Sequence, residues 1–274
     1  MRWNSSFPFS VFLIFILILT ENVHSQQTVQ LKNKKEIPIQ VTLGADLISR
    51  YIFRGTDYGN SPAIQPNFSF SVCGFKIGAW GSYGFSSWSR KINDSTIINM
   101  GNYAEFDLSI SYTFKWFTIG LTDYFFPNPL NPNEANNYFN YKNATTGHAM
   151  EGSLSFAGPE NFPIQVFVGT FFYGADKCKD SACVYGMGRE NNYSTYIEIA
   201  YIFKITHAGV DMKPFIGATP FGSSFYGKNA GFINVGFTAT KSIRFSDKFS
   251  LPVYVTLAAN PSSQNVFFVF GLTL

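Results

Sequence analysis

Apolar and polar residues alternate without interruption from Ala104 to Phe114. Every second residue is apolar (Ala104, Phe106, Leu108, Ile110, Tyr112 and Phe114), and the residues between them are polar (Glu105, Asp107, Ser109, Ser111 and Thr113). Because successive side chains of a strand point to opposite faces, this segment has one apolar face and one polar face. The pattern recurs along most of the chain, with aromatic residues at the ends of the apolar faces. It is typical of a membrane β-barrel.

Alternating runs bounded by Gly, Pro, Asn and Asp predict about twelve strands. They cover residues 39–54, 63–72, 75–86, 102–114, 117–125, 148–157, 164–173, 192–203, 209–219, 229–241, 250–259 and 264–274. Short connections follow the even-numbered strands, and several long polar connections follow the odd-numbered ones, at residues 87–101, 126–147 and 174–191. We expect the long connection at 126–147 either to fold inward as a constriction or to lie solvated at the surface. Outer-membrane barrels have short turns on the periplasmic side and long loops outside. The sequence therefore predicts an all-β fold, a single antiparallel up-and-down transmembrane β-barrel of about 12 strands with both termini in the periplasm.

The N-terminal residues have the pattern of a secretory signal peptide. Arg2 supplies a positive charge, Val11 to Leu19 form an apolar core, and Val23-His24-Ser25 ends on a small residue. The core is too short for a stable transmembrane helix, although an uncleaved anchor is the alternative. We expect a signal peptide at residues 1–25 and one outer-membrane barrel domain at residues 26–274 of a Gram-negative bacterium.

Composition changes this interpretation little. Aromatic residues make up 18% of the chain and charged residues 14%, whereas about a quarter of a typical soluble domain is charged. A net charge of +3 is too small to indicate a nucleic-acid partner. Cys178 and Cys183 flank a short polar stretch in an exported chain, which favours a loop-closing disulfide over free thiols. A metal site is less favoured, because no second ligand pair or His lies nearby.

The segment from Leu43 to Phe85 carries a family resemblance. It contains Ser49, Tyr51, Phe53, Arg54 and Gly55, then Pro62 to Pro66, then Gly78, Ala79 and Trp80. These elements resemble the TorF-type porin family, whose first strand has the form S-x-Y-x-F-R-G. The resemblance implies an outer-membrane barrel that conducts small solutes, and it supplies no substrate. The last strand alternates from Val266 to Leu274 and resembles the signal read by the barrel-assembly machinery, although Leu replaces the usual terminal Phe or Trp.

In a barrel of this kind the polar face of each strand points into the lumen. This parity selects ten lumen-lining candidates: Asp46, Arg50, Arg54, Lys76, Trp80, Glu105, Asp107, Glu151, Glu198 and Lys213. Their mixed charges are consistent with opposed acidic and basic walls, and equally with a salt-bridge network that fills a narrow lumen. Arg50 and Arg54 either stack on the wall as anion-attracting donors, or Arg54 pairs with a lumen carboxylate and holds the first hairpin in register. Gly55 is expected to supply a positive φ at the rim.

The sequence predicts a porin-like channel for passive diffusion of small hydrophilic solutes. A plugged or structural outer-membrane barrel is the alternative, and an outer-membrane lipid hydrolase is a weaker one. His148 shares the apolar face of its strand, but no Ser motif accompanies it, and His207 lies in a predicted turn, so we expect no enzyme activity. No cofactor is implied. The expected partners are outer-membrane lipid and lipopolysaccharide, the small solutes and the barrel-assembly machinery, with no nucleic acid.

Overall fold

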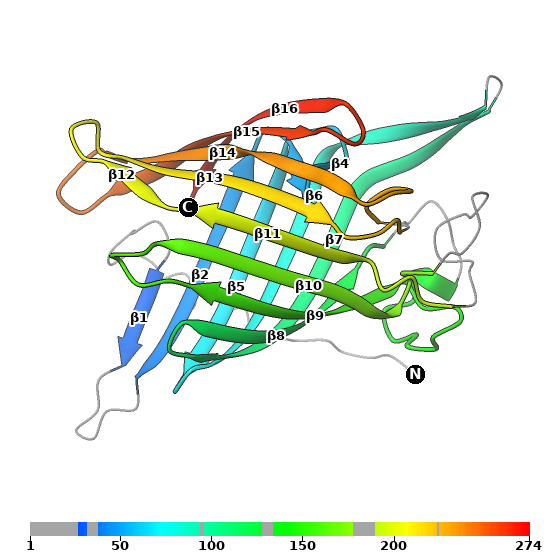
Figure 1. The fold of residues 1–274 in the computed structure, drawn as a ribbon, viewed down its shortest axis with the longest axis horizontal. Coiled ribbons are helices and arrows are strands. Elements are labelled where there is room, and N and C mark those ends of the chain that lie inside the picture. Colours follow the sequence, from blue (N-terminus) through cyan, green and yellow to red (C-terminus); the bar gives the residue numbers. More distant parts are fainter. Residues whose placement is uncertain (1–26, 32–37, 94–95, 128–133, 178–189, 224) are drawn as a thin grey trace, which may run out of the picture.

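The computed structural model describes residues 27–31, 38–93, 96–127, 134–177, 190–223 and 225–274. Twelve strands close into an antiparallel barrel (Figure 1), which confirms the predicted fold class. The wall strands are β2 (Ile39–Ile48), β5 (Ala63–Val72), β6 (Phe75–Asn93), β7 (Thr96–Phe114), β8 (Phe117–Phe125), β9 (His148–Ala157), β10 (Ile164–Gly174), β11 (Thr195–Tyr201), β13 (Val210–Thr219), β14 (Gly231–Arg244), β15 (Ser250–Asn260) and β16 (Asn265–Thr273). The remaining strands are β1 (Gln27–Leu31), β3 (Tyr51–Phe53), β4 (Thr56–Tyr58) and β12 (Phe203–Ile205), and a short 3-10 helix covers Glu134–Asn136.

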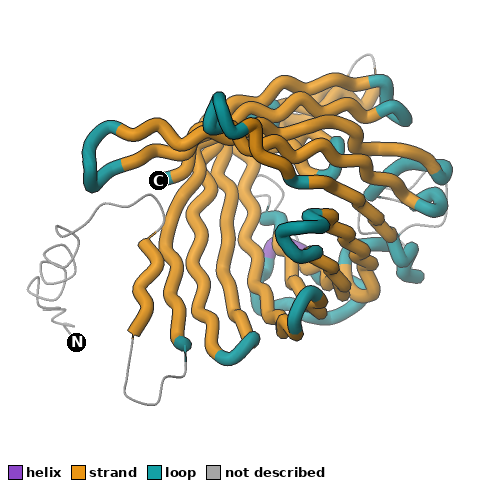
Figure 2. The backbone as a smooth tube through the Cα atoms, turned by 60° about the vertical axis from the view of Figure 1, so that its left-hand side comes forward, coloured by secondary structure: helices purple, strands orange, loops and turns teal. Residues whose placement is uncertain are grey.

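Each wall strand pairs with its neighbours in the chain, and β16 returns to pair with β2. This closing seam is short, because Gly271, Leu272 and Thr273 pair with Ile48, Leu47 and Asp46. Residues 39–43 of β2 pair instead with β1, which therefore continues the line of β16 along the same edge. Figure 2 shows β1 beside the strands that extend below the seam. Closure removes the unpaired edges that a membrane does not tolerate.

The predicted strand bounds agree with the structure over most of the wall. The bounds of β5, β8 and β9 match, while β6 and β7 extend well beyond the predicted 75–86 and 102–114. The first predicted strand, residues 39–54, is wrong at its end. The wall strand stops at Ile48, and residues 51–58 form a separate hairpin of β3 and β4 that pairs with no wall strand.

The two ends of the barrel differ, as the connection lengths predict. We call the end with the turns at 73–74, 115–116, 158–163, 206–209 and 245–249 the turn end, and the opposite end the loop end. On the outer face, large apolar side chains such as Phe68, Ile77, Ile110, Ile119 and Leu154 are exposed. A continuous exposed apolar face is what a lipid-facing wall requires.

The inner face carries small polar residues toward the turn end. Ser109 and Ser111 on β7 lie on the same face as the buried Glu105 and Asp107. On the neighbouring wall Thr118 pairs with Ser155 and Gly120 with Ser153, and all four share the inward face. Ser109 and Thr113 are exposed, so this part of the lumen is polar and open to water. Among the described residues, most buried inward-facing side chains, such as Glu105, Glu151 and Tyr196, lie toward the loop end.

Candidate functional site

The hairpin of residues 51–58, which we call the plug hairpin, folds into the lumen at the loop end. Its tip contacts β15, two strands from β2 around the barrel, where the Asn260 side chain donates to the Gly55 carbonyl at 3.1 Å. Gly55 also lies against β14, because a Cβ at this position would stand 1.8 Å from the carbonyl oxygen of Ile233. The hairpin leaves the wall after β2 and returns to it at the adjacent β5. It extends across the lumen because its tip residue Arg54 contacts Glu151 on β9, five strands from β2.

Backbone conformation explains the sharp tip. Arg54 and Gly55 have φ angles of 49° and 77°, the two positive values of a type I′ turn. Such a turn joins two antiparallel strands through two residues, here Phe53 and Thr56 as the flanking pair. Glycine adopts positive φ freely, whereas an arginine is strained there. A strained residue persists only where its surroundings stabilise it.

Arg54 is stabilised by an ion pair with the barrel wall. Its guanidinium donates to both carboxylate oxygens of Glu151 on β9, with a distance of 2.9 Å for the Nη2–Oε1 bond. The Arg54 side chain is 8% exposed and that of Glu151 2%. Arg54 also donates to the Tyr226 hydroxyl, and Tyr124 donates to Glu151 at 3.3 Å. Burial raises the pKa of the Tyr226 phenol despite the opposing effect of Arg54, so its hydroxyl stays neutral.

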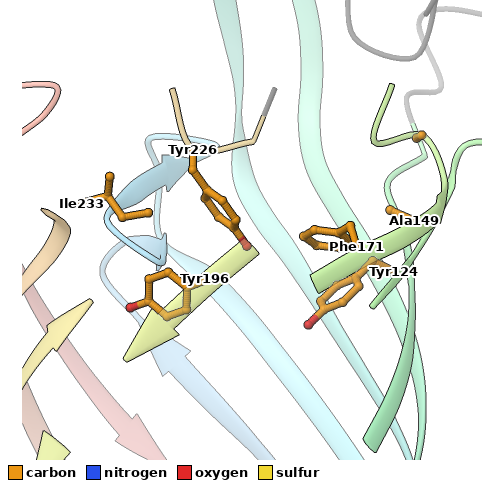
Figure 3. Close-up of a cluster of buried hydrophobic side chains, with 7 residues drawn as sticks. Tyr124, Ala149, Phe171, Tyr196, Tyr226 and Ile233 are labelled. Atoms are coloured by element: carbon orange, nitrogen blue, oxygen red, sulfur yellow. The ribbon is translucent and has the colours of Figure 1, made fainter. Parts of the chain in front are cut away.

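Aromatic rings enclose this ion pair. The Arg54 guanidinium carbon lies 4.6 Å from the ring centre of Phe53, 4.8 Å from that of Tyr196 and 5.0 Å from that of Phe167. These distances are within the range of cation–π attraction. Figure 3 shows Tyr124, Phe171, Tyr196 and Tyr226 converging from different parts of the wall and the loop end. The loop side of the lumen is therefore closed by the plug hairpin and the rings around it.

Two glycines on the wall make room for this arrangement. A Cβ at Gly169 on β10 would lie 2.6 Å from the carboxyl carbon of Glu151. A Cβ at Gly217 on β13 would lie 2.1 Å from the Tyr196 hydroxyl. Both positions therefore require glycine for a packing reason, since any side chain there would displace the groups that hold Arg54.

The structure separates Arg50 from Arg54. Arg50 lies at the loop-end mouth, where its side chain is 40% exposed and pairs with Asp57 at 3.3 Å. The expectation that the two arginines stack on one wall strand is wrong, because β2 ends at Ile48 and both arginines follow it in the chain. The alternative, in which Arg54 pairs with a lumen carboxylate, is the observed arrangement.

A second group of predicted residues gathers on β7 and the strands beside it. Glu105 is buried and accepts a 2.6 Å hydrogen bond from the Tyr103 hydroxyl. Asp107 is also buried, and its Oδ1 has no hydrogen-bond partner among the described residues. Trp80 packs against Tyr51 of the plug hairpin, with ring centres 5.5 Å apart. These residues surround the base of the hairpin.

The other predicted lumen residues are dispersed. Glu198 on β11 accepts hydrogen bonds from Tyr196 and Asn234, so it supports one of the rings around Arg54. Asp46 on β2 faces inward, with a buried Oδ1 that lacks a partner among the described residues. Lys76 is exposed on β6 and Lys213 is half-buried on β13. The described charges thus form local groups and do not line two opposed walls.

The loop after β8 covers a histidine on the outer face. His148 is fully buried, with Nδ1 2.8 Å from an Asp123 carboxylate oxygen and Nε2 2.6 Å from the Tyr138 carbonyl oxygen. Each ring nitrogen therefore lies within hydrogen-bond distance of an oxygen atom. Tyr141 stacks on the ring with centres 4.1 Å apart. The described part of the loop, residues 134–147, therefore packs on the outer face and does not constrict the lumen. Its residues 141–145 are exposed, in agreement with the alternative of a surface loop.

Several residues of the site were missed in the sequence analysis. Tyr226 lies in a loop and Asn260 at a strand end, and neither belongs to an alternating pattern that marks it. Tyr124 and Tyr196 are inward-facing rings, but their parity was obscured because aromatic residues also favour the lipid-facing side. The pair Arg54-Gly55 carried the one usable signal, since a charged residue followed by glycine inside an alternating run is compatible with a two-residue hairpin.

Cys178 and Cys183 lie outside the described residues, so their disulfide stays a prediction. Cys73 is free and exposed at a turn. Within the described ranges, no group of three or more His, Cys, Asp or Glu side chains is arranged to hold a metal ion. No helix in the same part of the chain is long and apolar enough to cross a membrane.

Comparison with known proteins identifies a family. A search among curated proteins found no match. The family model described as "Bacterial protein of unknown function (Gcw_chp)" matches residues 32–249, which includes the plug hairpin, its Glu151 partner and most of the wall. This description carries no activity and does not mention the TorF family or porins. Because the match covers most of its length, the chain belongs to the Gcw_chp family of bacterial proteins.

Proposed function

We propose that this protein is a gated channel of the bacterial outer membrane that admits small hydrophilic solutes when the plug hairpin leaves the lumen. A closed twelve-stranded barrel in a bacterial family is consistent with this location. The exposed apolar side chains of the outer face supply the lipid contact. The Ser, Thr and Gly residues of the inner face at the turn end supply a wall that water and polar solutes can wet.

The observation that carries the proposal is the way in which the lumen is closed. The obstruction consists of one short hairpin and the aromatic rings that pack around it. The hairpin is attached by its base to β2 and β5 and by its tip to Glu151 and Asn260. No wall strand hydrogen-bonds to β3 or β4 in a sheet. The hairpin can therefore leave without breaking the barrel's own ladders, and its departure joins the loop-end mouth to the polar half of the lumen.

A deletion that the register makes possible tests the proposal. Ile48 of β2 pairs directly with Ala63 of β5, so the two strands can be joined by a tight turn. In this variant Asn-Gly replaces residues 50–61. Ser49 is retained because its hydroxyl accepts a hydrogen bond from the Phe270 N–H of the closing strand β16. In planar bilayers, this variant should conduct continuously, whereas the full-length protein should be closed most of the time.

Heat-modifiable gel mobility of the deletion variant provides the folding control. The specific alternative is a structural barrel, favoured by the rings that pack around the plug, such as the edge-to-face pair of Tyr124 and Phe171 with ring centres 5.4 Å apart. A folded deletion variant that shows no conductance steps would support that alternative and refute the channel.

The proposal assigns no catalytic reaction, and both ring nitrogens of His148 are engaged under the covering loop. It keeps lipopolysaccharide as the neighbour of the loop end and the barrel-assembly machinery as the reader of the last strand. Pull-down of the assembly machinery by a nascent chain with and without residues 265–274 tests the second of these partners.

A further inference from the structure

A cavity of about 810 Å³ opens at the loop end, on the outer side of the plug hairpin. Gly55, Thr56 and Asp57 of the hairpin form part of its lining, and the segments around Tyr226 and Ser262 contribute most of the rest. The volume is within the range of about 300–1,000 Å³ that is usual for small-molecule sites. A solute that approaches from the loop end meets this cavity before it meets the plug.

Amides and hydroxyls dominate the polar lining. The cavity contains the side chains of Asn60, Asn229, Asn260, Asn265, Ser262 and Ser263. An amide side chain has both donors and an acceptor, and a hydroxyl is donor and acceptor at once. A ligand that matches such a lining must itself donate and accept at closely spaced positions, as neighbouring hydroxyl groups of a sugar do.

The charges at the cavity favour a neutral ligand. Arg50 is already paired with Asp57, so its planar group is partly occupied by a carboxylate of the protein. Lys228 is the remaining cation of the lining, and its side chain is exposed. A site for a strongly anionic group would present an arginine guanidinium that is not paired with a protein carboxylate. The described lining contains no such guanidinium.

Aromatic side chains complete the lining. Phe225, Tyr226 and Phe267 contribute ring surface to the cavity. A sugar ring has an apolar C–H face and a polar rim, so it can pack a face on an aromatic ring while its hydroxyls reach amides. We propose that this cavity binds a short neutral oligosaccharide, which identifies the solute class of the channel.

Two lining residues link the cavity to the plug. Asn260 holds the hairpin tip through its bond to the Gly55 carbonyl, and Tyr226 accepts a hydrogen bond from Arg54. The ring centre of Tyr226 lies 5.8 Å from that of Tyr196, one of the rings around Arg54 (Figure 3). A ligand that competes for Asn260 and Tyr226 loosens the tip, and this coupling rests on the proposed channel function. Binding itself does not depend on conduction.

Calorimetric titration of the full-length protein in detergent tests the proposal, with maltotriose and cellotriose as neutral probes and trigalacturonate as the anionic probe. We expect saturable binding of at least one neutral probe and weaker binding of trigalacturonate. Asn229→Ala and Asn265→Ala should each weaken the affinity by about five- to tenfold, the loss expected for one hydrogen bond. Asn161→Ala, at an exposed turn-end position, is the matched control and should bind as the unchanged protein does.

Absence of binding by both neutral probes, tighter binding of trigalacturonate, or equal affinity of the Asn265→Ala and Asn161→Ala variants would each overturn the assignment. The failures of the two proposals are distinguishable. Saccharide binding by a protein whose hairpin deletion does not conduct would refute the channel alone. Conduction by the deletion variant, with no saccharide binding by the full-length protein, would refute the carbohydrate site alone.

Discussion

Replacement of Glu151 by glutamine should open the channel, because it removes the charge that compensates Arg54. The side chains of the pair are 8% and 2% exposed, so little water is available to solvate a lone guanidinium. Breaking a buried ion pair by removal of one partner costs about 3–5 kcal/mol. Glutamine retains one acceptor oxygen, so we take the lower value, about 3 kcal/mol, for the loss in the free energy that holds the plug hairpin in the lumen. That corresponds to a change of about two orders of magnitude in the equilibrium constant between the hairpin inside the lumen and the displaced hairpin.

Single-channel recording in planar bilayers measures this change as open probability. Glu160→Gln, at an exposed turn, removes the same charge elsewhere and should leave the open probability unchanged. The double variant Arg54→Met with Glu151→Gln replaces the pair by neutral side chains of similar size inside the same ring of aromatic residues. Neutral replacements of buried pairs are often tolerated, so this variant should close again. If Glu151→Gln opens no more often than Glu160→Gln, or if the double variant is more open than Glu151→Gln, the ion pair does not hold the plug.

Three further changes test other parts of the structure. Gly55→Ala should raise conductance because its Cβ would collide with the Ile233 carbonyl. Gly209→Ala is the control, because Gly209 also has a positive φ but no atom lies within 4 Å of a Cβ there. Equal conductance of the two variants would argue against a hairpin tip packed on β14. His148→Ala should expose residues 134–147 to limited proteolysis by removing the ring that bonds Asp123 and the Tyr138 carbonyl, and unchanged cleavage would show that other contacts hold the loop. Cys73 should react with a membrane-impermeant maleimide only after the outer membrane is permeabilised, and labelling in intact cells would reverse the assigned orientation.

The wall of the barrel was predictable because its signal is local. A strand that faces lipid on one side and a polar lumen on the other must alternate with period two, and the turns between such strands need Gly, Asn, Asp or Pro. This is why the bounds of β5, β8 and β9 follow from the sequence. The longer β6 and β7 were underestimated because residues 87–101 do not alternate, although the two strands continue through them as a projecting hairpin (Figure 1).

The plug hairpin could not be separated from the first wall strand by the same argument. Residues 39–54 alternate at most positions, with Ile48, Ser49 and Ile52 as exceptions, and a hairpin packed inside a lumen needs two faces as much as a wall strand does. What distinguishes them is the partner: β2 pairs with β5 and β16, whereas β3 pairs only with β4. Pairing is a long-range property, and no local pattern encodes it.

The alternating pattern was sufficient to predict the class of fold, the two faces of the wall strands and the polar parity of Arg54 and Glu151. Parity predicts that a side chain faces the lumen. It does not predict the position of that side chain along the barrel axis, or which residue lies opposite it. Only the tertiary structure brought these two residues together across 97 positions of the chain. It did so because the shear of the closed barrel and the inward fold of one hairpin set the relative height of strands that are far apart in sequence. The same closure placed Tyr226, Asn260 and Gly55 around a single cavity, which no reading of their separate segments would assemble.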